Sequence, residues 1–173
     1  MNRRDTLKKL ILTSGGLIAL PAWANGWTIG DLTAHHSSFS GAEQDLMASV
    51  ADTIIPAGDS IGAISVGVDK YLQKLIEKCY EQEVQDNVKT QLMGLDASAQ
   101  NTYGKSFASC DQLQRQNLLI TLSTSETKEE KDFFSLMKSE TIRGFNTSKE
   151  VMTDYLRYKI FPGHYFGCVD VKV

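Results

Sequence analysis

Polar motifs that cap helices recur along this chain, and each one precedes apolar residues at helical spacing. The first motif is Ser40-Gly41-Ala42-Glu43, and Leu46, Val50 and Ile54 follow it at four-residue intervals. In such a motif the first and last side chains bind backbone N–H groups that the start of a helix leaves free. Apolar residues three or four positions apart lie on one face of a helix. Similar motifs occur at three later places, at 109–112, 127–130 and 147–150. Strand-like alternation is almost absent before the last ten residues, so we predict an all-α fold.

The apolar residues divide the body of the chain into about six predicted helices. Pro56 and the small residues up to Gly62 end the first of them. Five further apolar stripes mark the later helices: Val68, Leu72, Leu75, Ile76 and Cys79; Val84, Val88, Leu92 and Leu95; Leu113, Leu118, Leu119 and Leu122; Phe133, Phe134, Met137 and Ile142; Val151, Met152, Tyr155 and Leu156. We therefore expect a single helical bundle at 40–160. An extended segment at 25–39 precedes it, and an aromatic, irregular tail at 161–173 follows it.

The net charge of the chain is unevenly distributed. In all, 18 lysines and arginines stand against 21 acidic residues, which gives a net charge of −3. The first 24 residues carry +3, so the remainder carries −6. A surface of that charge without a basic block argues against binding to nucleic-acid phosphates or to anionic lipid. The remainder also lacks an apolar run long enough to span a membrane.

Residues 1–24 have the three parts of an export signal. A basic stretch at 2–9 is followed by a mildly apolar core at 10–20 and then by Ala22-Trp23-Ala24. Small residues at positions 22 and 24 are typical of a signal-peptidase site, which predicts cleavage before Asn25. An N-terminal anchor helix that is not cleaved is the alternative interpretation.

The basic stretch also indicates which export route is used. Arg3 and Arg4 are adjacent, and Leu7 and Lys8 follow them, which resembles a twin-arginine signal. Asp5, directly after the arginines, departs from that pattern. Because the twin-arginine route carries folded proteins, often with a cofactor, the rest of the chain is the place to look for a cofactor site.

The chain after residue 24 contains no recognisable cofactor or catalytic motif. It lacks the glycine-rich phosphate-binding loops, C-x-x-C and H-E-x-x-H. His35 and His36 are adjacent and lie in a polar segment, where histidines are mostly solvated. We expect no catalytic residue, no metal site and no cofactor of its own in this chain.

Aromatic residues outside the predicted helices are candidate contacts with a partner. Trp27 and Phe39 lie in the segment before the bundle. The tail contains His164, Tyr165 and Phe166. Aromatic side chains are enriched at the centres of protein interfaces. Packing of the same rings on this chain's own helices is the alternative.

Several motifs together resemble a known protein family. They are Asp52-Thr53-Ile54-Ile55-Pro56-Ala57, Gly67-Val68-Asp69-Lys70-Tyr71-Leu72, Phe133-Phe134, Thr141-Ile142-Arg143-Gly144-Phe145, Tyr158, and Pro162 to Cys168. With the twin-arginine leader, they resemble the gluconate 2-dehydrogenase subunit 3 family. The resemblance implies a small, non-catalytic subunit of a periplasmic, membrane-associated sugar or sugar-acid dehydrogenase.

The same resemblance implies partners and cofactors outside this chain. The catalytic subunit would be an FAD-containing flavoprotein of the glucose–methanol–choline type without an export signal, and a multihaem cytochrome with haem c is often the third member. This chain would fold with the flavoprotein and take it through the twin-arginine translocon. The alternative from another functional class is a stand-alone periplasmic helical enzyme or ligand-binding protein.

The three cysteines lead to a prediction about disulfides. Cys79 ends the second apolar stripe and Cys110 precedes the fourth, so we expect a bond between them in an oxidising compartment. Cys168 would then remain as a candidate for a covalent link to the flavoprotein. Buried free thiols are the alternative for each.

Overall fold

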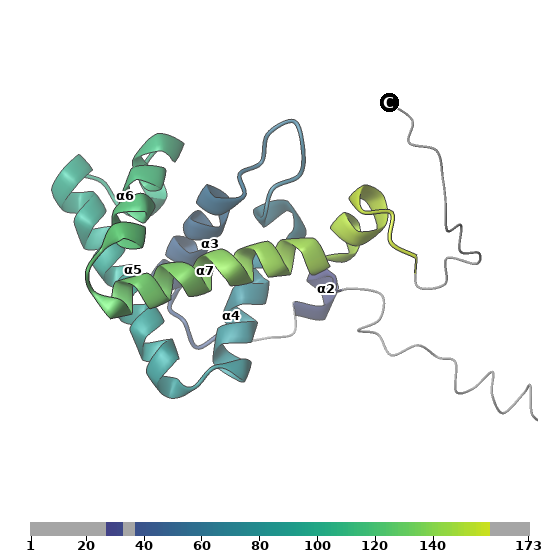
Figure 1. Ribbon diagram of the computed structural model, residues 1–173, viewed down its shortest axis with the longest axis horizontal. Helices are drawn as coiled ribbons and strands as arrows, with labels where there is room; N and C mark the ends of the chain where they lie inside the picture. The colour runs from purple at the N-terminus through teal and green to yellow at the C-terminus, as the bar shows by residue number, and fades with distance from the viewer. Residues whose placement is uncertain (1–26, 33–36, 160–173) are drawn as a thin grey trace, which may run out of the picture.

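The long helix α7 runs across the molecule and packs against α3, α4, α5 and α6 (Figure 1). This computed structural model describes residues 27–32 and 37–159. The α-helices of these residues are α2 Ile29–Leu32, α3 Gly41–Ile54, α4 Val68–Cys79, α5 Gln82–Tyr103, α6 Gln112–Thr124 and α7 Lys128–Thr147. Two short 3₁₀ turns are η2 Ile64–Val66 and η3 Phe107–Ser109, and η4 Val151–Tyr155 is a π-turn. The described residues contain no strand, so the predicted all-α bundle is confirmed.

The first predicted helix begins and ends where its sequence indicates. The Glu43 backbone N–H donates to Ser40 Oγ at 3.3 Å, and the Ser40 N–H donates to Glu43 Oε2 at 2.7 Å. Helix α3 ends at Ile54, and Ile55 has φ −132°. The residue before a proline is disfavoured in the helical region, and here Pro56 follows.

The second and third predicted caps differ from the structure. Asp111, not Ser109, caps α6: its carboxylate accepts the Gln114 N–H at 2.9 Å. Ser109 is instead the last residue of the 3₁₀ turn η3, and Cys110 follows it. Helix α6 therefore starts two residues later than the Ser109 motif predicts. Helix α7 does start after Thr127, but the Thr127 side chain makes no capping hydrogen bond.

The predicted sixth helix is a single π-turn rather than a separate α-helix. Ser148 is the C-cap of α7, and the π-turn Val151–Tyr155 begins three residues later. The Lys149 N–H donates to the Trp27 carbonyl at 3.0 Å. The Leu156 N–H donates to the Val151 carbonyl at 2.9 Å, which is the i to i+5 spacing of a π-turn.

Most of the predicted stripes form the core. Leu72 and Ile76 of α4, Leu92 of α5 and Phe133 of α7 are each no more than 1% exposed. Several stripe residues were predicted wrongly: Leu113, Ile142, Tyr155 and Leu156 are 72%, 39%, 54% and 60% exposed. Periodicity defines a helix face, but the position of the neighbouring helices decides how wide the buried part of that face is.

We expected the segment before the bundle to be extended, but part of it is helical. Ile29–Leu32 form one helical turn, and Leu32 is 7% exposed. Helix α2 packs against α4 (Figure 1). Contacts with the folded body therefore override the weak helix propensity of this polar segment.

Within the described residues, no helix has the length and apolar character that crossing a bilayer requires.

Candidate functional site

The structure describes only part of the predicted functional residues. The export signal residues Arg3, Arg4, Leu7 and Lys8, the cleavage residues Ala22 and Ala24, and the tail residues His164, Tyr165, Phe166 and Cys168 lie outside the described range. Trp27, Phe39, Cys79 and Cys110 lie within it. Their positions are reported below.

Phe39 is a core residue and not an exposed partner contact. It is 3% exposed, and Lys89 Nζ lies 5.3 Å from its ring centroid. The ring precedes the α3 cap Ser40, where it packs into the hydrophobic core. The sequence alone does not reveal this burial because it depends on helices far along the chain.

The expected bond between Cys79 and Cys110 is absent: both are free thiols. Cys79 is exposed at the end of α4, whereas Cys110 is 6% exposed within the core. The turn η3, which precedes Cys110, packs against α3 and α5 rather than against α4. Cys79 and Cys110 both lie near helix ends in the sequence, but those ends are therefore not neighbours in the fold.

Trp27 fixes the N-terminal arm, which we define as Trp27–Leu32, to the folded body. Its ring stacks on Tyr71 of α4, with 5.2 Å between ring centroids and 14° between ring planes. Its indole Nε1 donates to Thr147 Oγ1 at 3.1 Å, and its carbonyl accepts the Lys149 N–H at 3.0 Å. One residue thus joins the arm to both α4 and the end of α7.

Two glycines make the room that the arm and its neighbour Tyr71 require. Gly67 has φ +78°, and a Cβ there would lie 2.8 Å from Cγ1 of Ile29. A Cβ on Gly144 of α7 would lie 2.6 Å from Cδ1 of Tyr71. Carbon atoms in contact are normally about 3.5–4.0 Å apart, so neither position accepts a side chain without movement.

A cluster of polar side chains lies between the C-terminal end of α4 and helix α7. The Tyr80 hydroxyl donates to Glu140 Oε1 at 3.0 Å, and Arg143 lies 3.6 Å from the same oxygen. Burial raises the pKa of both Tyr71 and Tyr80 above the ordinary value of 10.0, and the negative charge of Glu140 raises each further. Both hydroxyls therefore remain protonated, and so able to donate, at neutral pH.

Large apolar side chains gather on the surface after α7. Tyr155, Leu156 and Tyr158 are 54%, 60% and 52% exposed, and we call them the C-terminal patch. Between them Arg157 has φ +51°, in the left-handed region that is rare for residues other than glycine, asparagine and aspartate. The sequence pattern predicted Tyr155 and Leu156 as a buried helix face, and the π-turn instead leaves them exposed.

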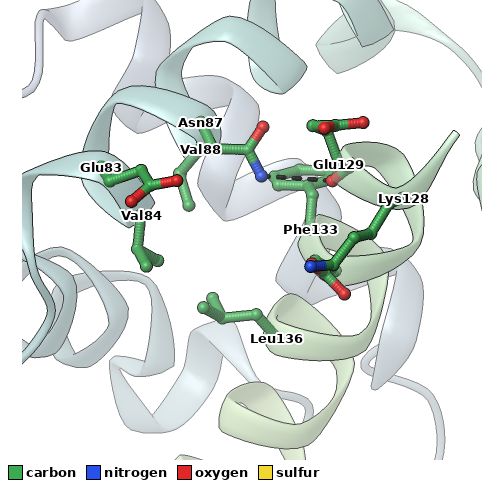
Figure 2. A pocket seen from close by; sticks show the side chains of 9 residues that line it. Glu83, Val84, Asn87, Val88, Lys128, Glu129, Phe133 and Leu136 are labelled. Carbon is green, nitrogen blue, oxygen red and sulfur yellow. Dashed lines mark hydrogen bonds between the residues drawn. The ribbon is translucent and has the colours of Figure 1, made fainter.

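A groove of about 440 Å³ lies between the N-terminal parts of α5 and α7 (Figure 2). Val84, Phe133 and Leu136 give it apolar walls, and Glu83 and Glu129 add carboxylates at its edge. The Asn87 amide donates to the carbonyl of Glu129 at 3.1 Å and so links the two helices. The carboxylates belong to the first turn of each helix, where they also counter the helix dipole.

The described residues offer few groups for metal binding, and their most distinctive surface is apolar. Among the described residues, no three His, Cys, Asp or Glu side chains are grouped closely enough to hold a metal ion. The three histidines of the sequence all lie outside the described ranges. The exposed apolar surface is the feature with the clearest physical use, because burying it on a partner is favourable.

Comparison with known proteins agrees with this arrangement. The family model of gluconate 2-dehydrogenase subunit 3 matches residues 41–163, which is well over half of the chain and includes α3 to α7. Comparisons with curated proteins and with solved structures gave no match. The chain therefore belongs to the gluconate 2-dehydrogenase subunit 3 family.

Proposed function

We propose that this chain is the non-catalytic small subunit of a periplasmic sugar or sugar-acid dehydrogenase. It folds with the FAD-containing catalytic subunit, stabilises it and takes it through the twin-arginine translocon. A multihaem cytochrome with haem c is the third member of the complex, through which the assembly associates with the membrane. The FAD and the substrate belong to the catalytic subunit.

The C-terminal patch is the observation that carries this proposal. An accessory subunit needs a face that its own core does not cover, and Tyr155, Leu156 and Tyr158 are each more than half exposed. Tyrosine is enriched among residues that dominate binding energies, since its ring is large and its hydroxyl tolerates water. We infer that the flavoprotein contacts this patch.

The test is a pull-down of the flavoprotein by variants of the patch. The triple change Tyr155→Ser, Leu156→Ser and Tyr158→Ser removes the apolar surface, and we expect it to weaken binding by about 2–4 kcal/mol, or about 30- to 1,000-fold in Kd. The double variant Leu113→Ser/Ile120→Ser is the matched control. These residues are also exposed, at 72% and 59%, but they lie on α6.

The two variants give a clear decision. Loss of binding in the patch variant with binding kept in the control supports the proposal, provided that both retain their helical circular dichroism. Equal binding in all three proteins would place the partner contact elsewhere and contradict the assignment of the patch.

Export is tested separately. Changing both Arg3 and Arg4 to Lys leaves the described fold unaltered, so we expect this chain and the flavoprotein to accumulate together in the cytoplasm. Dehydrogenase activity in the periplasmic fraction at the wild-type level would contradict joint export.

The groove between α5 and α7 favours one other candidate, a stand-alone ligand-binding protein. Its walls are apolar, and three carboxylates, of Glu83, Glu129 and Asp132, line it against the one ammonium of Lys128, which suits a cationic ligand with an apolar body. Thermal-shift screening of such amines against the chain and its Val84→Trp variant, which fills the groove, distinguishes this role from the subunit role. A shift that is lost in the variant, with no flavoprotein binding, would favour the ligand-binding protein.

A further inference from the structure

Helix α6 differs from the other long helices in its lack of charge. Its 13 residues include one charged side chain, Arg115, whereas α3, α4, α5 and α7 each contain three or more. Arg115 is itself neutralised within the chain, because its guanidinium lies 2.8 Å from the carboxylate of Asp52 on α3. Depletion of charged residues is the compositional signal of the core of a protein interface. The outer side of α6 therefore has the composition of an interface rather than of a solvated surface.

The same side of α6 carries large apolar side chains. Leu113 and Ile120 are 72% and 59% exposed. They are seven residues apart, which is about two helical turns, so they lie on one face with Gln116 and Asn117 between them. We call these four residues the α6 face. Burial of its two aliphatic side chains against another protein surface is favourable.

A shallow apolar pocket adjoins the α6 face. It has a volume of about 220 Å³, and its walls include Ile54 of α3, Leu119 of α6 and Phe134 of α7. Gln116 and Ile120 belong both to the pocket and to the α6 face. One helix therefore presents projecting apolar side chains and a recess beside them.

The polar part of the α6 face indicates which partner it fits. In a two-fold dimer, residues near the axis meet their own copies or close neighbours. Like charges would repel each other there, whereas the amides of Gln116 and Asn117 each contain a donor and an acceptor and so can pair with a second copy. The whole chain has a net charge of −3, so two copies approach most favourably through a face without charge. The α6 face is therefore complementary to itself.

We propose that two copies of this chain associate through their α6 faces, with the helices antiparallel and the two-fold axis between Gln116 and Asn117. This arrangement places Leu113 of one copy opposite Ile120 of the other, and so beside the pocket that Ile120 lines. The face is smaller than the roughly 20–30 residues per side of a standard interface, so we expect a reversible dimer with a micromolar dissociation constant.

The dimer contact and the C-terminal patch are separate surfaces. Helix α6 and the π-turn η4, where the patch begins, lie at opposite ends of the molecule (Figure 1). A dimer formed through α6 leaves the patch accessible to the flavoprotein. The inference therefore does not depend on the proposed function, and either can fail without the other.

The test is sedimentation velocity of the full chain over a range of concentrations. The decisive variant is Leu113→Ser/Ile120→Ser, which removes the apolar side chains from both sides of the contact. The matched control is Ile64→Ser/Met93→Ser, because these residues are also exposed, at 40% and 58%, but lie on η2 and α5. The triple variant of the C-terminal patch tests the patch as a competing site of self-association.

We expect the wild type, the matched control and the patch variant to dimerise alike, and the α6 variant to have a dissociation constant about 100-fold higher or more. A wild-type chain that is monomeric up to about 1 mM would overturn the proposal. A dimer that persists in the α6 variant, or that is lost in the patch variant, would also overturn it. Circular dichroism checks that every variant keeps its helices.

A single cysteine tests the position of the two-fold axis independently. In a Cys79→Ser/Cys168→Ser background, Asn117→Cys places a thiol beside the axis, so oxidation with copper phenanthroline should join two copies through a disulfide. Met93→Cys in the same background is the control, and it should run as a monomer on a non-reducing gel. Equal yields of covalent dimer from the two variants would contradict the α6 contact.

Discussion

Gly144 decides whether Tyr71 can pack against α7, and its change to alanine tests the arm and its neighbours directly. In the interior of a helix, glycine to alanine normally stabilises a protein by about 0.5–1 kcal/mol, because alanine loses less conformational entropy on folding. At Gly144 the new Cβ would lie 2.6 Å from Cδ1 and 2.8 Å from Cε1 of Tyr71. The ring would have to move by about 1 Å to restore normal carbon contacts.

The cost of that movement outweighs the gain in helix propensity. Overpacking of a filled site typically costs about 1–3 kcal/mol. Tyr71 cannot shift freely, because it also stacks on Trp27 at 5.2 Å. We therefore expect Gly144→Ala to lower the free energy of unfolding by about 1–2 kcal/mol. In a chain of this size, each kcal/mol lost lowers Tm by about 2–4 °C.

Two further variants separate the clash from the propensity effect. Gly94 lies in α5, and a Cβ there would meet no atom within 4 Å, so Gly94→Ala should stabilise the protein by up to about 1 kcal/mol. In a Tyr71→Ala background the clash is gone, and Gly144→Ala should become neutral or stabilising. Urea unfolding followed by circular dichroism measures all the variants. If Gly144→Ala stabilises the protein as much as Gly94→Ala does, the packing argument is wrong.

Three other predictions concern caps, tyrosines and thiols. Ser40→Ala should cost about 1 kcal/mol in urea unfolding and Thr127→Ala less, because only the first side chain caps its helix; equal costs would contradict this. Burial raises the pKa of Tyr80 above 10.0 in the folded state, so its contribution to stability is present below pH 10 and is lost as the pH rises through the raised value. The free energy of unfolding should therefore fall above pH 10, and less steeply in Tyr80→Phe. In a Cys168→Ser background, a thiol reagent should modify exposed Cys79 at once and buried Cys110 only on unfolding, and the unreduced protein should contain both thiols.

The helices could be predicted because their signals are local. A capping motif and a 3.6-residue period involve residues within one or two turns, and α3, from Ser40 to its end before Pro56, follows them closely. The same local reasoning placed α4 and α7 correctly, since Val68 and Phe133 lie on faces that other helices cover. A local signal fails where two helix starts compete, as at Asp111, whose carboxylate rather than the Ser109 hydroxyl provides the cap.

The candidate site was harder to predict because each of its features depends on distant residues. From the sequence, Phe39 was a candidate partner contact, and only the packed helices show that it belongs to the core. Trp27 was predicted as a candidate partner contact, but in the structure it contacts this chain's own Tyr71 and Thr147, which lie 44 and 120 residues away in the sequence. No window of sequence contains both ends of such a contact. Gly144, which leaves room for the Tyr71 ring, is the one sequence feature that points to this contact. It can be interpreted only once α4 and α7 are known to be neighbours.

The turn after α7 joins the binding site of the N-terminal arm to the C-terminal patch. Ser148 is fully buried there, and the Lys149 N–H, which a longer helix would use internally, binds the Trp27 carbonyl instead. The chain then forms the π-turn that leaves Tyr155 and Leu156 exposed. Docking of the arm and exposure of the patch therefore depend on one interruption of the helix. If α7 continued as a regular helix through 148–156, the Lys149 N–H would be used within the helix, and we expect the arm to lose this anchor.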